Sequence, residues 1–495
     1  MLRRTFIQSG LAAAALAPFG RVLAKGVGGT TRDLEARTLT GGEVILTQKG
    51  VNDFIAGLRG TALLPGDAAY DDVRRVWNGM INRRPALIAR CAGAADVMRS
   101  VDFARDHNLL VAVRGGGHSI SGQSVCDGGL MIDLAPMRSV KVDPVARRAT
   151  LGPGALLGDL DRECLAFGLV TTAGTVSHTG AAGLTLGGGQ GRLQRIHGLT
   201  CDNLVAADLI AANGELVRAN ERDNQELLWG LRGGGGNFGV VTAFEYRLHP
   251  FSGTVLGGEL LYPLEQARSV YDFYADFTQT TPDELHLTMA MISPTGGKPL
   301  VAVQACYAGD LARGERVIEP LRRHGKPIAD RIKPMPYLEL QTNNDVANAA
   351  GKNYYAKSGF VSRLEPGLLD ELIGSFPTAP GRATVAVIQQ FGGAMSRVPE
   401  DATAYAGRKA AYEILALGGW SDATRNEQNI AEVRGYWKRL ESYTRGFYIN
   451  TSSQEEQGSV RANYGRHYER LVKLKDRHDP GNLFRLNANV KPSVT

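Results

Sequence analysis

His118 is the residue whose type and setting most favour chemistry, because it directly follows three glycines in the run Arg114 to Ser119. Two further glycine-rich runs span residues 187–191 and 233–239. Glycine has no Cβ, so such runs let backbone N–H groups converge on an anion such as a pyrophosphate. The loop could then bring the imidazole against the same bound group. Two plainer interpretations stay open at this point: the runs are flexible turns, and His118 is a structural histidine.

The run 233–239 contains a bare G-x-G-x-x-G pattern at Gly234, Gly236 and Gly239. That fingerprint indicates a dinucleotide site only when a strand precedes it and a helix follows, so that the phosphate meets the helix N-terminus. Residues 240–248 follow here, and their β-branched and aromatic content is typical of a strand. No G-x-x-x-x-G-K-[ST] occurs either. The sequence therefore argues against both a Rossmann loop and a P-loop.

Length and composition limit the class of protein. At 495 residues the chain exceeds one hydrophobic core, since single cores stop growing at roughly 250 to 300 residues. With 43% hydrophobic and 21% charged residues it has the composition of an ordinary globular protein. Its five cysteines are widely spaced and form no C-x-x-C pair, so neither a disulfide framework nor a zinc site is expected. We expect a two-domain protein without a metal.

Residues 1–24 have the three parts of an export signal. Arg3 and Arg4 stand in twin-arginine position, followed by the apolar stretch 11–16 and the small-residue site 22–24. The apolar stretch is shorter than the about 20 residues that a membrane span needs. Removing residues 1–24 lowers the formal charge from +6 to +3, which gives no case for nucleic acid or anionic membranes as partners. We predict export by the twin-arginine machinery to the periplasm or medium; the alternative is an intracellular protein with a fortuitously basic start.

Short strands and helices alternate over residues 50–250, and a leader arm over residues 26–49 precedes them. After Pro250 the pattern changes to longer strands paired with helices, typical of an antiparallel sheet covered by helices on one face. A helix is expected over 460–477, in a C-terminal segment that returns to the first domain. We therefore predict an α+β fold with a first domain at 50–250, a substrate domain at 251–445 and a C-terminal segment at 446–495.

Several segments together resemble one known family. They are, in chain order, Val113 to Ser119, Gly174-Thr175-Val176, Gly183 to Gly189, Gly198 to Leu204, Gly233 to Gly239, Tyr448-Ile449-Asn450 and Asp479 to Phe484. Over residues 60–495 the chain resembles the FAD-linked oxidases of the berberine-bridge-enzyme-like group, with the vanillyl-alcohol-oxidase or PCMH-type FAD-binding fold, and in particular their bacterial 6-hydroxynicotine-oxidase-like members. The resemblance implies that FAD is the cofactor and that a flavin-dependent oxidation is the activity.

The resemblance also assigns residues to the flavin. His118 would be bonded to the 8α-methyl carbon of FAD, and the run Arg114 to Ser119 would cradle the pyrophosphate. Many relatives attach the flavin a second time through a cysteine, but the corresponding window, Thr179 to Gly183, holds none. We therefore expect a single covalent link, with Cys201 as a small buried hydrophobe. The expected cofactor-binding residues are His118, Arg114, Gly115, Gly116, Gly117, Ser119, Gly174, Thr175, Gly180, Gly183, Gly188, Gly191 and Val240.

For the proton that leaves the substrate, the resemblance points to the strand before a Gly-Gly pair and to the Tyr-x-Asn strand near the C-terminus. The first offers Gln389, which cannot take a proton, where some relatives have a carboxylate. Strand alternation would place Tyr448 and Asn450 on one face, while Thr451 stands where an aromatic residue is frequent. Tyr448 is the base candidate that remains, although its pKa of about 10 would have to be lowered by neighbours. A core tyrosine with a satisfied hydroxyl is the alternative.

These inferences predict an oxidase that transfers a hydride from an alcohol or amine carbon of a small organic substrate to FAD, and then passes the electrons to O2. Tyr354, Tyr355 and Lys357 are further candidates for the pocket wall, unless they form a surface cluster. Two other functions stay open. One is a dehydrogenase of the same fold that reduces another acceptor, and the other is a flavin-holding protein without turnover, which the missing carboxylate would suit.

Overall fold

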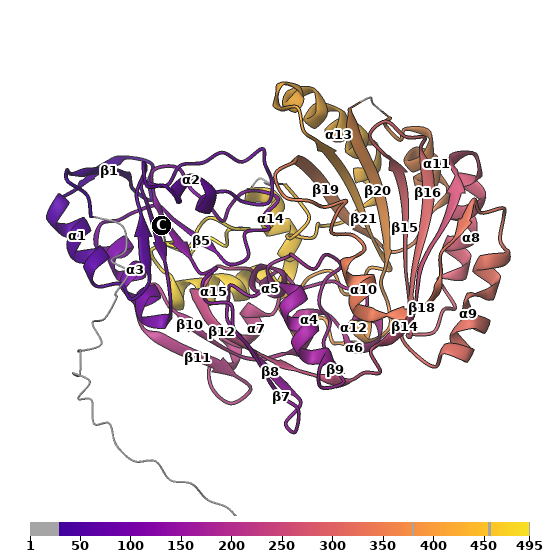
Figure 1. Cartoon of the computed structure of the whole chain (residues 1–495), viewed down its shortest axis with the longest axis horizontal. Helices are drawn as coiled ribbons and strands as arrows, with labels where there is room; N and C mark the ends of the chain where they lie inside the picture. The colour runs from indigo at the N-terminus through magenta and orange to yellow at the C-terminus, as the bar shows by residue number, and fades with distance from the viewer. Residues whose placement is uncertain (1–28, 379–380, 454–456, 495) are drawn as a thin grey trace, which may run out of the picture.

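The computed structural model describes residues 29–378, 381–453 and 457–494, so the predicted signal at 1–24 lies outside the described residues. Figure 1 shows the sheets of the N-terminal half on one side of the molecule and one large sheet with its helices on the other. The expected leader arm is wrong over residues 34–46, where β1 (Leu34–Arg37) and β2 (Glu43–Leu46) form an antiparallel hairpin. The hairpin buries Ala36 and Leu46 in the same core as α1 (Gln48–Ala56), so its neighbours supply the apolar surface that its own sequence lacks.

The first sheet delivers the histidine loop. Three of its strands, β4 (Leu87–Arg90), β6 (Leu130–Asp133) and β5 (Val111–Arg114), are parallel neighbours, and β3 (Thr61–Leu63) pairs antiparallel with β4. Helix α3 (Ala94–Asp106) buries its apolar stripe in the core on one face of this sheet, as its spacing predicts. The short α2 (Tyr70–Val73) packs in a separate core, where Tyr70 lies with Ile88 and Met131. The chain leaves the carboxyl end of β5 directly into the first glycine run, which fixes where His118 emerges.

The second sheet carries the other two glycine runs on its connections. Its strands are all antiparallel, in the order β11-β10-β12-β8-β7. Val240 begins β12, so a strand follows the third glycine run, as predicted. The elements are β7 (Val140–Asp143), β8 (Arg148–Leu151), α4 (Leu157–Leu165), α5 (Ala181–Leu186), α6 (Gln194–His197), η1 (Thr200–Asn203), β10 (Leu204–Ile210), β11 (Leu216–Asn220), α7 (Gln225–Leu231) and β12 (Val240–Arg247), while β9 (Leu169–Val170) pairs with β13 (His249–Pro250) outside the sheet.

The third sheet is antiparallel throughout, in the order β17-β14-β16-β15-β20-β21-β19, with β18 paired to β14. Helices cover one face of it (Figure 1), and that face buries a single apolar core. The α+β prediction and the helix-covered antiparallel sheet are confirmed. The elements are β14 (Thr254–Pro263), α8 (Ala267–Phe277), β15 (Leu285–Ser293), β16 (Leu300–Tyr307), α9 (Leu311–Arg323), β17 (Ala329–Asp330), β18 (Lys333–Pro336), α10 (Tyr337–Thr342), β19 (Asn353–Val361), α11 (Pro366–Gly374), β20 (Arg382–Gln390), α12 (Ala394–Arg397), β21 (Tyr412–Trp420) and α13 (Asn426–Leu440), with η2 (Leu264–Gln266), η3 (Ala423–Arg425) and η4 (Glu441–Tyr443).

The C-terminal segment packs on the second sheet, where Leu471 and Leu474 share a core with α7. The helix predicted over 460–477 is interrupted: α14 (Gln457–Tyr464) and α15 (Tyr468–His478) are separated by η5 (Gly465–His467), because Gly465 adopts a φ of +48°. A fully buried ion pair, Lys475 Nζ to Asp479 Oδ2 at 2.6 Å, anchors the turn after α15. Among the described residues, none of the helices has the length and apolar character needed to cross a bilayer.

Candidate active site

A cavity of about 420 Å³ lies where the glycine runs face the third sheet. This volume falls within the roughly 300–1,000 Å³ that is usual for ligand sites. Its walls come from the loops after β5 and β9, the starts of α5 and β12, strands β20 and β21, and residues 448–451 and 484–488. Segments far apart in the sequence therefore build one site.

The first glycine run packs in direct backbone contact with Gly180, the residue before α5. A Cβ on Gly116 would lie 2.4 Å from the Cα of Gly180, and one on Gly180 would lie 2.7 Å from the backbone N of Gly116. Gly117 adopts a φ of +71°, in the left-handed region that side chains avoid. These contacts require glycine for a structural reason, so the runs are not merely flexible turns.

Other glycines leave room for a bound group. A Cβ built on Gly183 or Gly236 would meet no heavy atom within 4 Å, and both residues line the cavity. Each added methyl would therefore enter the space itself. A large planar or phosphate-bearing group can approach the backbone closely at these positions.

His118 lies in the wall of the cavity with a free ring nitrogen. Its Nε2 is buried without a hydrogen-bond partner, and the indole of Trp77 stacks on the imidazole with centroids 4.5 Å apart and planes 19° apart. Burial, and secondarily the neighbouring His178, lowers the pKa of His118 to about 4. At neutral pH the imidazole is thus uncharged and keeps a lone pair for a bond to carbon.

Trp77 also ties the two halves of the molecule together beside this histidine. Its other face stacks on Tyr354 of β19, with centroids 3.9 Å apart, and its Nε1 donates to the Asn348 carbonyl at 2.7 Å. Asn78 next to it donates to the carbonyls of Tyr354 and Ile120 and accepts from the Tyr354 backbone N–H. These contacts of Trp77 and Asn78 hold the imidazole in one orientation.

Most of the predicted site residues meet in the cavity. The three expected near the chemistry, Tyr448, Asn450 and Gln389, all line it. Arg114, Gly188 and Gly191 do not: the Arg114 guanidinium donates to the Val73 carbonyl. The expected cofactor-binding residues that line the cavity are Gly115, Gly116, Gly117, His118, Ser119, Gly174, Thr175, Gly180, Gly183 and Val240.

The Tyr448 to Asn450 segment is a turn and not the predicted strand, with the Thr451 N–H donating to the Tyr448 carbonyl. The two side chains nevertheless meet, because the turn brings Asn450 Nδ2 within 2.8 Å of the Tyr448 hydroxyl. That hydroxyl also accepts the backbone N–H groups of Gly189 and Gln190, at 3.0 and 3.2 Å. Burial raises the pKa of Tyr448, with only partial compensation by these donors. This direction is opposite to what a base at neutral pH needs.

Gln389 has a carboxylate beside it that sequence reasoning did not single out. Gln389 on β20 is the Cα partner of Glu413 on β21, and Glu413 is only 3% exposed. The Thr451 hydroxyl, which lines the cavity, donates to Glu413 Oε1 at 2.8 Å. Burial raises the pKa of Glu413 to about 7. The available signal was a lone acidic residue in an otherwise apolar strand, Tyr412 to Trp420.

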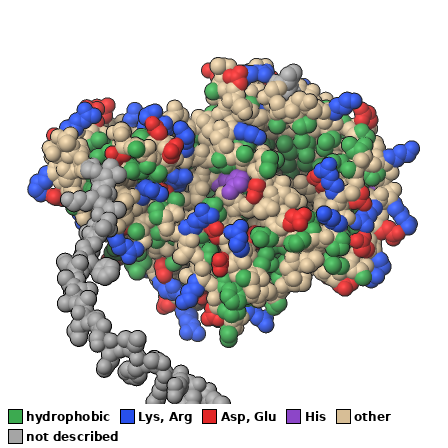
Figure 2. Space-filling view, viewed as in Figure 1, with side chains coloured by type: hydrophobic (Ala, Val, Ile, Leu, Met, Phe, Trp, Pro, Cys, Tyr) green, Lys and Arg blue, Asp and Glu red, His purple; other side chains and the backbone are tan. Residues whose placement is uncertain are grey.

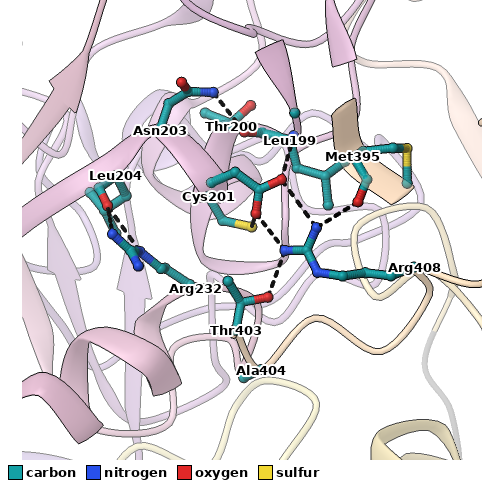
Figure 3. Close-up of polar contacts among 12 residues, drawn as sticks. Leu199, Thr200, Cys201, Asn203, Leu204, Arg232, Met395, Thr403, Ala404 and Arg408 are labelled. Carbon is teal, nitrogen blue, oxygen red and sulfur yellow. Dashed lines mark hydrogen bonds and ion pairs between the residues drawn. The ribbon is translucent and has the colours of Figure 1, made fainter. Parts of the chain in front are cut away.

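Cys201 lies behind the cavity. It is 0% exposed, does not line the cavity, and burial raises the pKa of its thiol well above the usual range. Figure 3 shows it near Arg408, whose guanidinium donates to the Thr403 hydroxyl and the Met395 carbonyl. Arg408 also forms a buried ion pair with Asp202, the residue after Cys201. This cluster fixes the loop that carries Tyr405, whose ring packs against Gly188.

The remaining candidates for the pocket wall, Tyr354, Tyr355 and Lys357, lie outside the cavity. Tyr354 belongs to the stack on Trp77, and Tyr355 is buried in the core beneath the helices, where Arg434 Nε donates to its hydroxyl at 2.9 Å. They form neither the wall nor a surface cluster: both tyrosines are buried.

Comparisons with known proteins agree with this geometry. Residues 85–220 match the family described as FAD binding domain, and residues 447–491 match the family described as berberine and berberine like. An FAD-linked oxidoreductase of Dictyostelium discoideum is 32% identical over 450 residues, which are 89% of this chain and 97% of that protein. The (R)-6-hydroxynicotine oxidase of Paenarthrobacter nicotinovorans is 30% identical over 452 residues, with 88% and 97% covered.

Solved structures agree with this. The 6-hydroxy-D-nicotine oxidase of Arthrobacter nicotinovorans superposes with a TM-score of 0.81 at 30% identity, over 88% of this chain and 98% of that one. The glucooligosaccharide oxidase of Acremonium strictum has a TM-score of 0.81 at 23% identity, over 90% and 98%, which shows a common fold.

The family matches and the relatives show an FAD-dependent oxidoreductase, and the glycine-lined cavity beside an uncharged histidine agrees with that class. The chain belongs to the FAD-linked oxidoreductases with a berberine-like C-terminal segment. FAD is its cofactor, and the observed cavity, with its open glycines and the free His118 Nε2, fits that group.

Proposed function

We propose that the protein is an oxidase in which FAD is bonded to His118, and which oxidises an alcohol or amine carbon of a small organic substrate. The observation that carries this proposal is the free, buried Nε2 of an uncharged His118 in the wall of the cavity that also contains Gln389 and Tyr448. When bound, the flavin supplies the acceptor for a hydride and O2 then takes the electrons.

The chain's own residues would divide the work between two ends of the cavity. The glycine runs and Val240 would hold the dinucleotide through backbone contacts. Trp77 orients the imidazole, and the substrate would sit against β20 and β21 beside Asn450 and Tyr448. A structural neighbour, the glucooligosaccharide oxidase, carries a cysteinyl and histidyl FAD. Here Cys201 lies outside the cavity, which supports a single link.

The test of the covalent link is a mass measurement on the denatured holoenzyme. We expect the polypeptide mass plus FAD for the natural sequence, and the bare polypeptide mass for His118→Ala. His178→Ala is the matched control, since this second histidine lies 5.1 Å away, also has an unpaired Nε2, and does not line the cavity. Retention of acid-stable flavin by His118→Ala would refute the assignment.

The test of the oxidase activity uses the same preparation. A substrate should bleach the flavin without oxygen, and air should restore the colour with release of one hydrogen peroxide for each substrate oxidised. Bleaching without peroxide on readmission of air would instead favour a dehydrogenase that uses another acceptor.

We further propose that residues 1–24 direct export by the twin-arginine route. Arg3, Arg4, the apolar stretch and the small-residue site support this. N-terminal sequencing of protein from the periplasm or medium should begin at Lys25, and replacing both arginines by lysine should leave full-length protein in the cytoplasm. Full-length protein in the cytoplasm with the arginines intact would contradict the proposal.

A further inference from the structure

A buried carboxylate, that of Glu413 on β21, lies next to the cavity. Gln389 lines the cavity, but its amide cannot take a proton. Glu413 lies directly across the β20–β21 pair from Gln389, on the same face of the sheet. It is separated from the cavity by one hydroxyl, that of Thr451, at 2.8 Å.

Neutral groups surround this carboxylate. Its partners are the hydroxyls of Thr451 and Ser358 and the amide of Gln190, and no cation of the described residues is ion-paired with it. The acidic groups that face it are the hydroxyls of Tyr405 and Tyr448. Arg408, which lies over the ring of the neighbouring Tyr405, is paired with Asp202. A carboxyl so placed can be charged or neutral near pH 7, because burial without a cation favours its neutral form.

We propose that Glu413 receives the substrate's proton through the Thr451 hydroxyl, which Gln389 across the strand pair cannot do. The inference rests on the proposed oxidation. As the substrate C–H bond breaks, its hydrogen leaves with both electrons for the flavin. The O–H or N–H proton passes to Thr451 Oγ1 while the Thr451 proton passes to Glu413 Oε1, and the C=O or C=N bond forms. Glu413 is thus a positioning and relay residue. Tyr448 is a neighbour whose hydroxyl is held in place by hydrogen-bond donors.

A pair of substitutions tests this relay. Glu413→Gln should slow anaerobic flavin reduction by benzylic alcohols or amines by about 100-fold or more, the usual contribution of a general base. The double variant Glu413→Gln with Gln389→Glu should recover at least tenfold, because the carboxylate returns to the same pair of positions. Thr451→Val should slow reduction as Glu413→Gln does. In all of these the flavin content should be unchanged.

The matched control is Asp161→Asn. Asp161 is also fully buried, bonded to the Gln341 amide at 3.0 Å, and burial raises its pKa to about 7, but it does not line the cavity. The rate of flavin reduction should fall as pH drops through 7 in the natural enzyme and in Asp161→Asn. In Glu413→Gln this decrease in rate below pH 7 should be absent. An unchanged pH dependence of flavin reduction in Glu413→Gln, or no recovery of the rate in the double variant, overturns the relay.

A substrate-independent readout separates this inference from the proposed function. Infrared difference spectra of the holoenzyme between pH 6 and 8 should show carboxyl bands from both residues, one of which Glu413→Gln removes and Asp161→Asn keeps. If no benzylic compound bleaches the natural enzyme, the oxidation proposal fails for that class. Absence of a Glu413 band overturns the relay by itself.

An independent observation narrows the substrate. The face of the third sheet opposite its helices presents half-buried aliphatic side chains at adjacent register positions: Ile292 on β15, Val385 and Val387 on β20, and Leu415 and Leu417 on β21. Figure 2 shows hydrophobic side chains gathered in a hollow on this side of the molecule. Leu415 and Leu417 line the same cavity as His118, so this aliphatic surface continues into the active site.

We infer that this surface holds the apolar body of the substrate, whose alcohol or amine group reaches Thr451. Aliphatic side chains cannot pair with sugar hydroxyls, and unpaired hydroxyls would lose their bonds to water. The substrate is then an aryl or alicyclic alcohol or amine and not an oligosaccharide. This second inference also rests on the proposed oxidation.

The test compares kcat/KM for benzylic alcohols and amines with that for cello-oligosaccharides. We expect at least a 100-fold preference for the benzylic compounds, and at least a tenfold loss of it in Leu417→Asn. Leu216→Asn, at an exposed aliphatic position on β11, is the matched control and should change nothing. An equal or higher kcat/KM for the oligosaccharides overturns the inference, while bleaching by neither class counts against the oxidation itself.

Discussion

The two walls of the cavity differ in whether backbone or side chains form their surface. The cofactor wall is glycine backbone held by contacts such as that between Gly116 and Gly180. The substrate wall is the open face of a regular antiparallel sheet, and side chains of β20 and β21 make its surface. Where glycine backbone packs on glycine backbone, as at Gly116 and Gly180, a Cβ does not fit. Strand alternation, by contrast, lets the open-face side chains change without touching the helix-side core. Cofactor binding should therefore be sensitive to small substitutions, and substrate choice should be adjustable.

The largest effect should follow from Gly116→Val. Its Cβ would lie 2.4 Å from backbone that cannot move aside, and overpacking of this kind destabilises by about 1–3 kcal/mol or more. We expect loss of flavin absorbance per polypeptide and a lower Tm. Gly374→Ala, where a Cβ would meet nothing within 4 Å, is the control and should keep both. A flavin-loaded Gly116→Val protein would break the distinction between the walls.

Trp77→Ala tests the stacking of the indole on His118 and Tyr354. Trp77 is 7% exposed and stacked on both His118 and Tyr354, so we expect destabilisation of about 3–5 kcal/mol. Covalent loading should also fall, because the imidazole loses the stack that orients it. Chemical denaturation and the mass of the denatured protein measure the two effects. Full covalent loading at the normal rate would show that Trp77 does not orient His118.

Glu413 should make stability depend on pH. Its pKa is raised to about 7 in the folded protein from 4.5, so between these pH values the folded state holds a proton that the unfolded state has lost. Stability should therefore fall as pH rises from 4.5 to 7, by up to roughly 3 kcal/mol at about 1.36 kcal/mol per pKa unit. Urea unfolding of Glu413→Gln at pH 5 and 8 should lack this component and keep that of Asp161. If the free energy of unfolding changed equally with pH in the two proteins, this would contradict the raised pKa of Glu413.

The smallest effect should come from the substrate wall. Leu417→Ala removes a half-buried side chain from the open face of β21, and we expect less than about 1 kcal/mol of destabilisation and unchanged flavin loading. Ile414→Ala, on the helix-covered face of the same strand and 0% exposed, should lose about 2–5 kcal/mol. Similar losses for the two variants would show that the open face is part of the core.

Local patterns predicted much of this arrangement. The apolar spacing of α3, the strand that begins at Val240 and the helix-covered antiparallel sheet after Pro250 all follow from periodicity, because packing against one neighbour repeats along the chain. The Tyr448 turn and the break at Gly465 did not follow, because both depend on contacts with distant segments and on a single positive φ. The β1–β2 hairpin was missed for the same reason.

By itself, the sequence determined the family and the cofactor, and it singled out His118 as the expected attachment residue, since these rest on consecutive residues whose backbone chemistry is local. Only the tertiary structure decided that Glu413 lies opposite Gln389 and one hydroxyl from the cavity, and that Arg114 points away from it. Strand register and loop packing set these relations. Both arise from contacts between residues far apart in the chain, which a linear pattern does not contain.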